Sequence, residues 1–158
     1  MSNSVVAFHV NGREVSVQGD SGQSLLDVLR NTLHLKATRM GCGQGACGAC
    51  RVMVDGHAMA ACETPLWSVQ GKHITTVEGL GTREAPHALQ TAFIEEQAMQ
   101  CGFCTSGILM SAAALLQRQA HPSRQEIVQV LDGHLCRCGA HNRVIRAIEK
   151  AANTSATA

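Results

Sequence analysis

The chain has no tyrosine and few other aromatic residues: three Phe and a single Trp among 158 residues. Only 16% of its residues are charged, and its net charge of +1 comes without any run of Lys or Arg. Nucleic-acid surfaces depend on clustered basic residues or on aromatic stacking platforms, and this composition provides neither. The sequence therefore predicts no nucleic-acid partner.

Long apolar runs and targeting signals are also missing. The longest apolar stretch, around residues 108–116, falls well short of the roughly 20 residues that span a bilayer. The first residues lack the basic segment and apolar segment of a secretory signal. We therefore expect no direct membrane insertion and a cytoplasmic location, with co-export to the periplasm beside a signal-bearing partner as the alternative.

Cysteine, in contrast, is abundant, and all eight cysteines fall into two groups of four. Disulfides are disfavoured because nothing in the sequence indicates secretion. The first group has the spacing C-x4-C-x2-C-x11-C, which is typical of a plant-type [2Fe-2S] ferredoxin. The second has the spacing C-x2-C-x31-C-x-C. The two groups are Cys42, Cys47, Cys50 and Cys62, and then Cys101, Cys104, Cys136 and Cys138.

Structural zinc sites are the main rival, since they also use four cysteines. Zinc ribbons usually carry two C-x2-C pairs, and neither group has two, so the first group favours iron–sulfur. The spacing of the second group does not distinguish zinc from iron–sulfur. A Rieske centre needs two histidine ligands, and only Cys138 and His141 have a suitable spacing, so no histidine is predicted to be a ligand.

The first cysteine group lies in a glycine-rich loop. Residues 43–48 match G-x-G-x-x-G, but the motif follows a predicted helix rather than a strand and contains Cys47. Dinucleotide binding is therefore disfavoured. We predict instead that the glycines at 41, 43, 45 and 48 let the loop wrap around a cluster and bring backbone N–H groups close to the sulfurs. Such hydrogen bonds raise the reduction potential.

The N-terminal half reads as α+β. Residues 5–10 and 14–17 are two β-branched runs around Asn11-Gly12, which is a strong hairpin signal. Leucines at helical spacing follow Ser24, so a helix is predicted over residues 25–33. A further strand that ends in an Asp-Gly turn is predicted over residues 51–57, and a last strand over residues 74–77.

The C-terminal half has helical patterns only. Helices are predicted over residues 87–99, 105–119, 124–131 and 142–151, with Thr105 and Ser123 as N-caps. The turn-forming composition between the halves predicts a linker at residues 79–85. We therefore expect one domain over residues 1–78 and a small helical bundle over residues 86–158.

Three motifs in order carry a resemblance to a known family: GCGQGACGAC at residues 41–50, QCGFCTSG at residues 100–107 and LCRCG at residues 135–139. With them the chain resembles the iron–sulfur subunit of the xanthine oxidase family of molybdenum hydroxylases, and is most similar to the isoquinoline- and aldehyde-oxidising type. The resemblance covers nearly the whole chain. It implies a β-grasp plant-type ferredoxin domain, then a four-helix-bundle domain with a second [2Fe-2S] cluster, and so favours iron over zinc in the second group.

The resemblance also implies a route for electrons. They would leave a molybdenum–molybdopterin cofactor held by a large subunit, pass the second cluster and then the first, and reach an external acceptor, either a FAD subunit or a cytochrome. Cys138 would be both an iron ligand and a neighbour of the pterin, and Gln100 would hydrogen-bond to the pterin. The substrate would be an aldehyde or an N-heteroaromatic compound. A freestanding ferredoxin-like carrier is the alternative.

The chain departs from the family's pattern at Gly139-Ala140-His141, where a histidine stands in place of an aromatic residue. This puts local contacts with the large subunit in doubt. The length leaves no room for a flavin or molybdenum domain, so we expect one subunit of an assembly. No nucleophile or open metal site is predicted, because the cysteines are all used as ligands.

Overall fold

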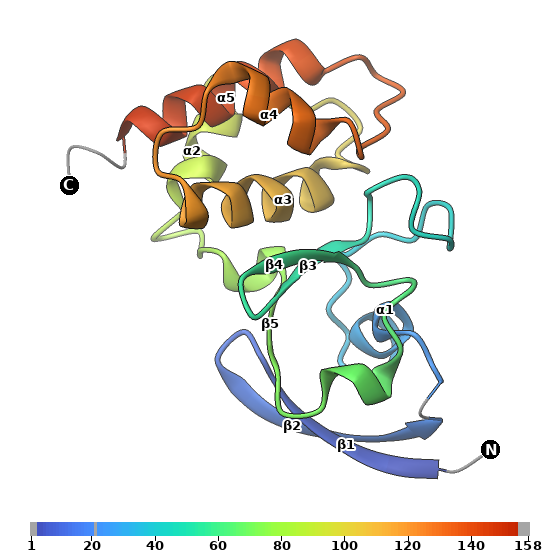
Figure 1. The fold of residues 1–158 in the computed structure, drawn as a ribbon. Coiled ribbons are helices and arrows are strands. Elements are labelled where there is room, and N and C mark those ends of the chain that lie inside the picture. Colours follow the sequence, from blue (N-terminus) through green and yellow to red (C-terminus); the bar gives the residue numbers. More distant parts are fainter. Residues whose placement is uncertain (1–2, 21, 155–158) are drawn as a thin grey trace.

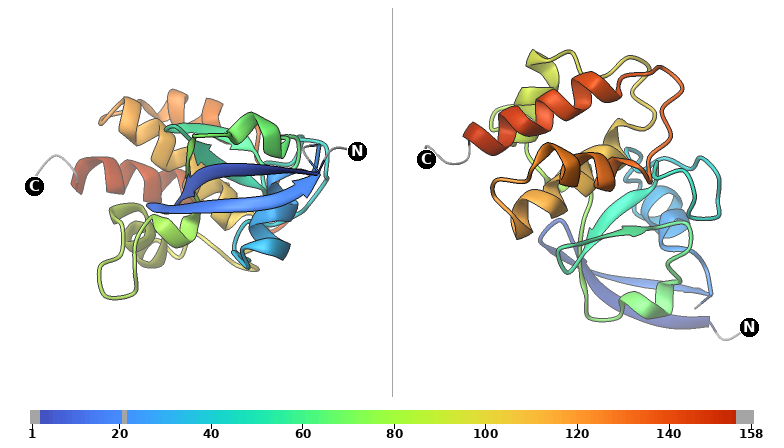
Figure 2. Two further views of the ribbon diagram at one scale, coloured as in Figure 1. Left: turned by 90° about the horizontal axis from the view of Figure 1, so that it is seen from below. Right: turned by 45° about the horizontal axis from the view of Figure 1, so that its top comes forward.

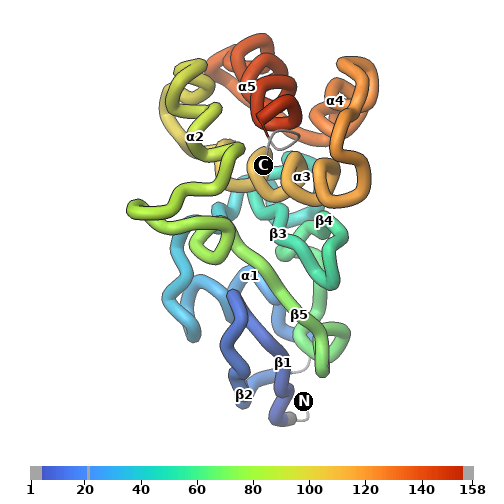
Figure 3. The backbone as a smooth tube through the Cα atoms, turned by 90° about the vertical axis from the view of Figure 1, so that its left-hand side faces the viewer, coloured from blue at the N-terminus to red at the C-terminus, as the bar shows by residue number. Residues whose placement is uncertain are grey.

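The computed structural model describes residues 3–20 and 22–154. A mixed sheet with short helical segments forms the N-terminal part, and helices stack above it (Figure 1). Seen along the sheet, the four C-terminal helices form a separate layer (Figure 3). The predicted α+β class, with a sheet domain followed by a helical domain, is confirmed.

The sheet has five strands in the order β2-β1-β5-β3-β4. β1 and β5 are parallel, while the other neighbouring pairs are antiparallel, and this mixed order is the β-grasp arrangement. Asn11 and Gly12 have φ of 50° and 79°, as a tight hairpin turn requires, so the predicted hairpin is confirmed. The strands are β1 Asn3–Val10, β2 Arg13–Asp20, β3 Arg51–Val54, β4 His57–Ala60 and β5 His73–Thr75.

The predicted strand that ends in an Asp-Gly turn is present as β3 and its turn, and an unpredicted strand follows it. The turn at Asp55-Gly56, with φ of 49° and 80°, separates β3 from β4, a strand that the sequence pattern did not predict. β4 has the sequence His-Ala-Met-Ala, and without β-branched residues it lacks the strand signal that marks β3.

The predicted helix of the sheet domain begins as α1 (Leu25–Asp27) and continues as a π-helical segment, η1 (Val28–Thr32). Ser24 is its N-cap, since its Oγ accepts a hydrogen bond from Asp27 N at 3.2 Å. Two short 3-10 helices complete this half, η2 (Leu66–Val69) and η3 (Val77–Gly79).

Four helices form the C-terminal half, as predicted. They are α2 (Ala88–Glu95), α3 (Thr105–Arg118), α4 (Arg124–Leu131) and α5 (His141–Thr154). Ser123 caps α4, as predicted, whereas the prediction of Thr105 as an N-cap was wrong by one residue, because Cys104 precedes the first turn of α3. No helix in the described ranges is long and apolar enough to cross a bilayer.

β3 joins the two halves through its alternating side chains. Val52 and Val54 are buried in the core of the sheet domain, whereas Met53 points to the opposite face and is buried among the helices. This follows from the two-residue period of a strand. α3 therefore lies against the outer face of β3, as two further views also show (Figure 2).

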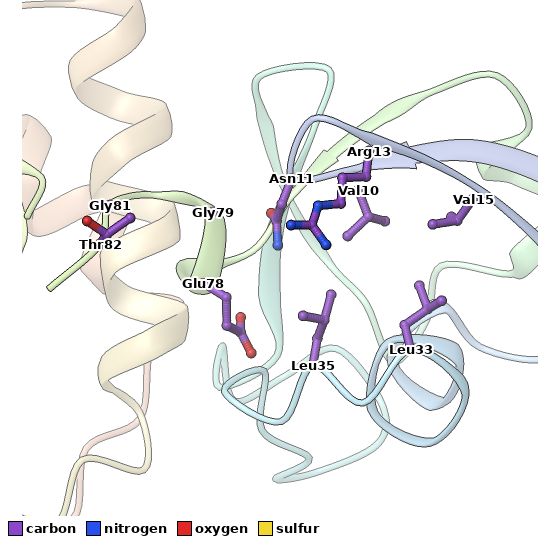
Figure 4. Close-up of a pocket in the computed structure, with 10 residues that line it drawn as sticks. All are labelled: Val10, Asn11, Arg13, Val15, Leu33, Leu35, Glu78, Gly79, Gly81 and Thr82. Atoms are coloured by element: carbon purple, nitrogen blue, oxygen red, sulfur yellow. The ribbon is translucent and has the colours of Figure 1, made fainter. Parts of the chain in front are cut away.

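The chain between the halves is tied to the sheet domain. Asn11 Oδ1 accepts a hydrogen bond from Thr76 N, and Glu78 Oε1 accepts one from Ala37 N, both at 2.9 Å. Asn11 and Glu78 also border a cavity of about 510 Å³, which none of the eight cysteines lines (Figure 4).

Candidate iron–sulfur centres

The first cysteine group is assembled by one loop and one hairpin. Cys42 and Cys47 lie in the irregular loop after η1, and Cys50 comes directly before β3. Cys62 follows β4, and Ala61 N donates to Cys50 O at 3.2 Å, which holds the two ends of the hairpin together. The G-x-G-x-x-G motif opens no helix here, since β3 follows it.

Backbone N–H groups of the loop point at these sulfurs. Gln44 N donates to Cys42 Sγ at 3.4 Å, and Gly45 N donates to Cys62 Sγ at 3.2 Å. Gly43, Gly45 and Gly48 have φ of 71–75°, as predicted for the loop. Gly41 serves differently: a Cβ there would lie 2.7 Å from Cys47 Sγ.

The second group is assembled at helix ends, as predicted. Cys101 and Cys104 come just before α3, and Cys136 and Cys138 lie in the loop between α4 and α5. Cys101 contacts Cys138, and Cys104 contacts Cys136. Each of these two contacts therefore joins the segment before α3 to the loop between α4 and α5. Both cysteine-bearing loops lie on the same side of the molecule, at the right of Figure 1.

Each group contains at least one thiol whose pKa is lowered and one thiol whose pKa is raised by burial. The N–H of Gln44 lowers the pKa of Cys42 to about 7, and the N–H of Phe103 lowers the pKa of Cys101. Burial raises the pKa of Cys50 to about 11 and that of Cys104 to about 12. The buried thiols therefore need a strong cation to ionise them, which an iron centre provides.

Hydrogen-bond contacts link the sulfurs of each group in two pairs. Cys42 contacts Cys47 and Cys50 contacts Cys62, just as the second group pairs across its two segments. Within residues 3–20 and 22–154, no three His, Cys, Asp or Glu side chains are placed to share one metal ion. Two pairs suit a binuclear cluster, with two thiolates for each iron, better than a mononuclear zinc site.

Gln100 lies beside Cys138. Its Nε2 donates to the Cys138 backbone oxygen at 3.2 Å, and its side chain is exposed. The structure thus brings together the two residues that were predicted to meet the pterin.

The two cysteine groups meet through the backbone. Leu135 N donates to Cys47 O at 3.1 Å, and Leu135 immediately precedes Cys136. The close approach depends on two glycines: a Cβ at Gly107 would lie 2.1 Å from Gly48 O, and a Cβ at Gly48 would lie 2.4 Å from His134 Nδ1.

The sequence pattern missed the buried residue in this contact, His134, which is 4% exposed. Its Nε2 is 2.9 Å from Ser111 Oγ, and its backbone oxygen is 3.1 Å from Nε2 of His141. His141, the residue that departs from the family's pattern, thus holds the second cysteine loop. No spacing signal could have identified His134, because its side-chain partner Ser111 lies 23 residues away in the sequence.

Comparison with known protein families identifies a cluster-binding domain in each half of the chain. Residues 8–74 match the model of a 2Fe-2S iron–sulfur cluster binding domain, and residues 76–149 match that of a [2Fe-2S] binding domain. The chain therefore binds two [2Fe-2S] clusters.

Relatives match over nearly the whole chain. A nicotinate dehydrogenase subunit of Pseudomonas putida is 48% identical over 149 residues, which are 94% of this chain and 95% of that protein. The alpha subunit of isoquinoline 1-oxidoreductase from Brevundimonas diminuta is 46% identical, over 96% of this chain and all of that protein.

Solved structures share the fold. Quinoline 2-oxidoreductase from Pseudomonas putida 86 matches with a TM-score of 0.92 and 36% identity, over 98% of this chain and 97% of that one. Aldehyde oxidoreductase from Desulfovibrio gigas matches with a TM-score of 0.94 and 38% identity, over 98% of this chain but only 17% of that one. Similarity of this extent, with both cluster-binding domains in order, shows that the chain belongs to the iron–sulfur subunits of the xanthine oxidase family of molybdenum hydroxylases.

Proposed function

We propose that this chain carries electrons from the molybdenum–pterin centre of a large partner subunit to an external acceptor, during oxidation of an aldehyde or N-heteroaromatic substrate. The observation that carries the proposal is the hydrogen bond from Leu135 N to Cys47 O, at 3.1 Å. It connects the two cysteine groups by a short path of covalent bonds and one hydrogen bond. A [2Fe-2S] cluster takes up and releases one electron at a time.

The ligands in this proposal are the eight cysteines. Amides that donate to the sulfurs, such as those of Gln44 and Gly45, would stabilise the more negative reduced state. The molybdenum–molybdopterin cofactor would be held mainly by the partner subunit. The first cluster would take Cys42, Cys47, Cys50 and Cys62, and the second Cys101, Cys104, Cys136 and Cys138.

The second group has the surface expected of a buried partner interface. Phe103 is 47% exposed and Leu135 is 68% exposed, and both border a cavity of about 500 Å³ that Cys101, Cys104 and Cys136 also line. Exposed apolar side chains at one site mark contact surfaces. We therefore place the large subunit here, with Cys138 and Gln100 next to the pterin.

The first group then faces the outer acceptor, for which the two candidates are a cytochrome and a FAD subunit. A freestanding electron carrier is the second candidate function, which the exposed apolar surface at Phe103 and Leu135 disfavours. Purification from cells that express the neighbouring genes separates the two functions. A chain that works within a complex co-purifies with a large molybdenum-containing chain, whereas a freestanding carrier elutes alone.

The variant Cys138→Ser tests the ligand and the route together. In the assembled complex we expect the EPR signal of the second cluster to be lost or altered, while that of the first cluster is retained. Turnover with nicotinate, isoquinoline or an aldehyde as trial substrates should slow, because electrons leave the partner more slowly.

Cys42→Ser is the reciprocal control, since it should alter the first signal and leave the second. Two unchanged EPR signals and normal turnover in Cys138→Ser would contradict the assignment. Iron and acid-labile sulfide analysis provides the baseline, at about four of each per chain.

A further inference from the structure

A further cavity, with several charged and polar side chains in its lining, lies between the two halves of the molecule. It measures about 250 Å³ and opens between the β3–β4 hairpin and helices α3 and α4, which lie next to each other in Figure 1. Its polar lining consists of Arg51, His57, Ser111, Arg118 and His134, and no Asp or Glu lines it. The cavity thus combines two permanent positive charges with two imidazoles and a hydroxyl.

Neither arginine is neutralised by a carboxylate among the described residues. Arg51 Nη1 donates to Ala58 O at 3.4 Å, and Arg118 Nε donates to Ala114 O at 3.3 Å. Both contacts are to neutral carbonyl groups, and each guanidinium keeps further N–H donors.

The nearest acidic side chain along the hairpin is already engaged. Asp55 Oδ2 pairs with Lys72 Nζ at 3.1 Å, and Asp55 Oδ1 accepts from His73 N at 2.9 Å. These contacts lower the pKa of Asp55, the His73 N–H most of all. The positive charge of the cavity is therefore left without an internal counter-charge.

The inner wall of the cavity is rigid and polar. Ser111 is 5% exposed and His134 is 4% exposed, and their hydrogen bond of 2.9 Å fixes both side chains. The two guanidinium groups, one from each domain, bring their N–H donors to this wall.

We propose that this cavity binds a small tetrahedral oxyanion of the phosphate or sulfate class. Guanidinium groups bind such anions through paired N–H donors. A volume of about 250 Å³ accommodates one such ion, whereas pockets for larger ligands usually exceed about 300 Å³. The inference does not depend on the proposed electron route.

The position of the site gives the anion a second effect. Arg51 follows Cys50 directly, and His134 is two residues before Cys136, so the site adjoins both cysteine groups. A bound anion adds negative charge beside the centres and disfavours their reduction. Occupancy should therefore lower the midpoint potential of at least one cluster.

Isothermal titration of the full chain, loaded with both clusters, tests the site directly. Sodium phosphate and sodium sulfate are titrated at constant ionic strength in chloride buffer, and saturable binding with one site per chain is expected. Arg118→Gln should weaken binding about tenfold or more, because a charge-assisted contact is lost. Arg118→Lys keeps the positive charge but loses the planar guanidinium group. Its affinity for the anion should lie between those of the wild type and Arg118→Gln.

The matched control is Arg83→Gln, which removes the same charge from an exposed residue outside the cavity. An equal loss of affinity in Arg83→Gln would show a general charge effect and would overturn the proposal. So would acetate binding as tightly as phosphate, or no saturable binding of either tetrahedral anion. A redox titration followed by EPR provides the independent readout: phosphate should lower a midpoint potential in the wild type but not in Arg118→Gln.

Discussion

Single glycines determine how closely the two cysteine loops approach each other. Gly48, with φ of 75°, lies against Gly133 O and the ring of His134, and Gly107 lies against Gly48 O. Only a residue without a side chain fits at either position. The hydrogen bond between Leu135 N and Cys47 O depends on that fit.

Gly48→Ala should therefore destabilise the chain more than an ordinary glycine substitution. A Cβ would lie 2.4 Å from His134 Nδ1 and 2.5 Å from Gly133 O. The left-handed backbone costs about 1–2 kcal/mol for alanine, and overpacking adds about 1–3 kcal/mol. Thermal or denaturant unfolding of the cluster-loaded chain measures the loss.

Gly102→Ala is the matched control, because Gly102 has φ of 77° but open space around its Cα. It should lose only the backbone contribution, about 1–2 kcal/mol. If the free energy of unfolding fell equally in the two variants, the close contact of residue 48 with His134 and Gly133 would not contribute to the destabilisation.

Among the elements, helix α2 has an unusual cap that titrates. His87 is the N-cap: its Nδ1 accepts a hydrogen bond from Leu89 N at 3.2 Å, and Gln90 Oε1 accepts one from His87 N at 2.9 Å. Burial lowers the pKa of His87, since the charged imidazolium is poorly solvated there. The neutral ring that this favours is also the form that can accept the capping bond.

This cap should make stability depend on pH. Because the folded-state pKa of His87 is depressed, the folded state binds fewer protons than the unfolded state, and its stability is complete above about pH 6.5. Stability should fall as the pH drops through that value and level off below the folded-state pKa. Thermal unfolding between about pH 7.5 and about pH 5.5 measures the change.

His87→Asn keeps a capping acceptor that does not titrate in this range, so its stability should change less with pH. His121→Asn, at an exposed position between α3 and α4, should retain the dependence of the wild type. If His87→Asn and the wild type lost the same stability on acidification, the cap would not be the cause.

At the scale of the whole molecule, exposed apolar residues distinguish two faces. Phe103 and Leu135 border the second cysteine group, whereas Trp67, which is 61% exposed, belongs to η2 of the sheet domain. If the large subunit covers the second cysteine group, Phe103 and Leu135 are buried in the complex and Trp67 stays exposed.

Phe103→Ser and Leu135→Ser should accordingly weaken assembly. Truncating a central apolar contact typically costs about 2 kcal/mol or more, which is more than tenfold in affinity. Co-purification with the large subunit, quantified against iron content, measures the effect. Trp67→Ser should assemble like the wild type, and equal assembly in all three variants would place the partner elsewhere.

Much of the fold could be predicted because its signals are local. The Asn11-Gly12 turn, the leucines after Ser24 and the apolar faces of the C-terminal helices each depend on neighbours in the sequence. β4 was missed because it contains no β-branched residue, and Thr105 was misplaced as a cap because the exact end of a helix varies by a residue or two.

The two groups of four cysteines, the sheet domain and the helical domain can all be inferred from the amino-acid order, since spacing and periodicity are local properties of the chain. The contacts between the sulfurs, the hydrogen bond from Leu135 to Cys47, and the cavity shared by Arg51 and Arg118 become known from the three-dimensional fold alone. Those contacts join residues far apart in sequence. They exist only because β3 buries side chains on both of its faces and so packs α3 against the sheet.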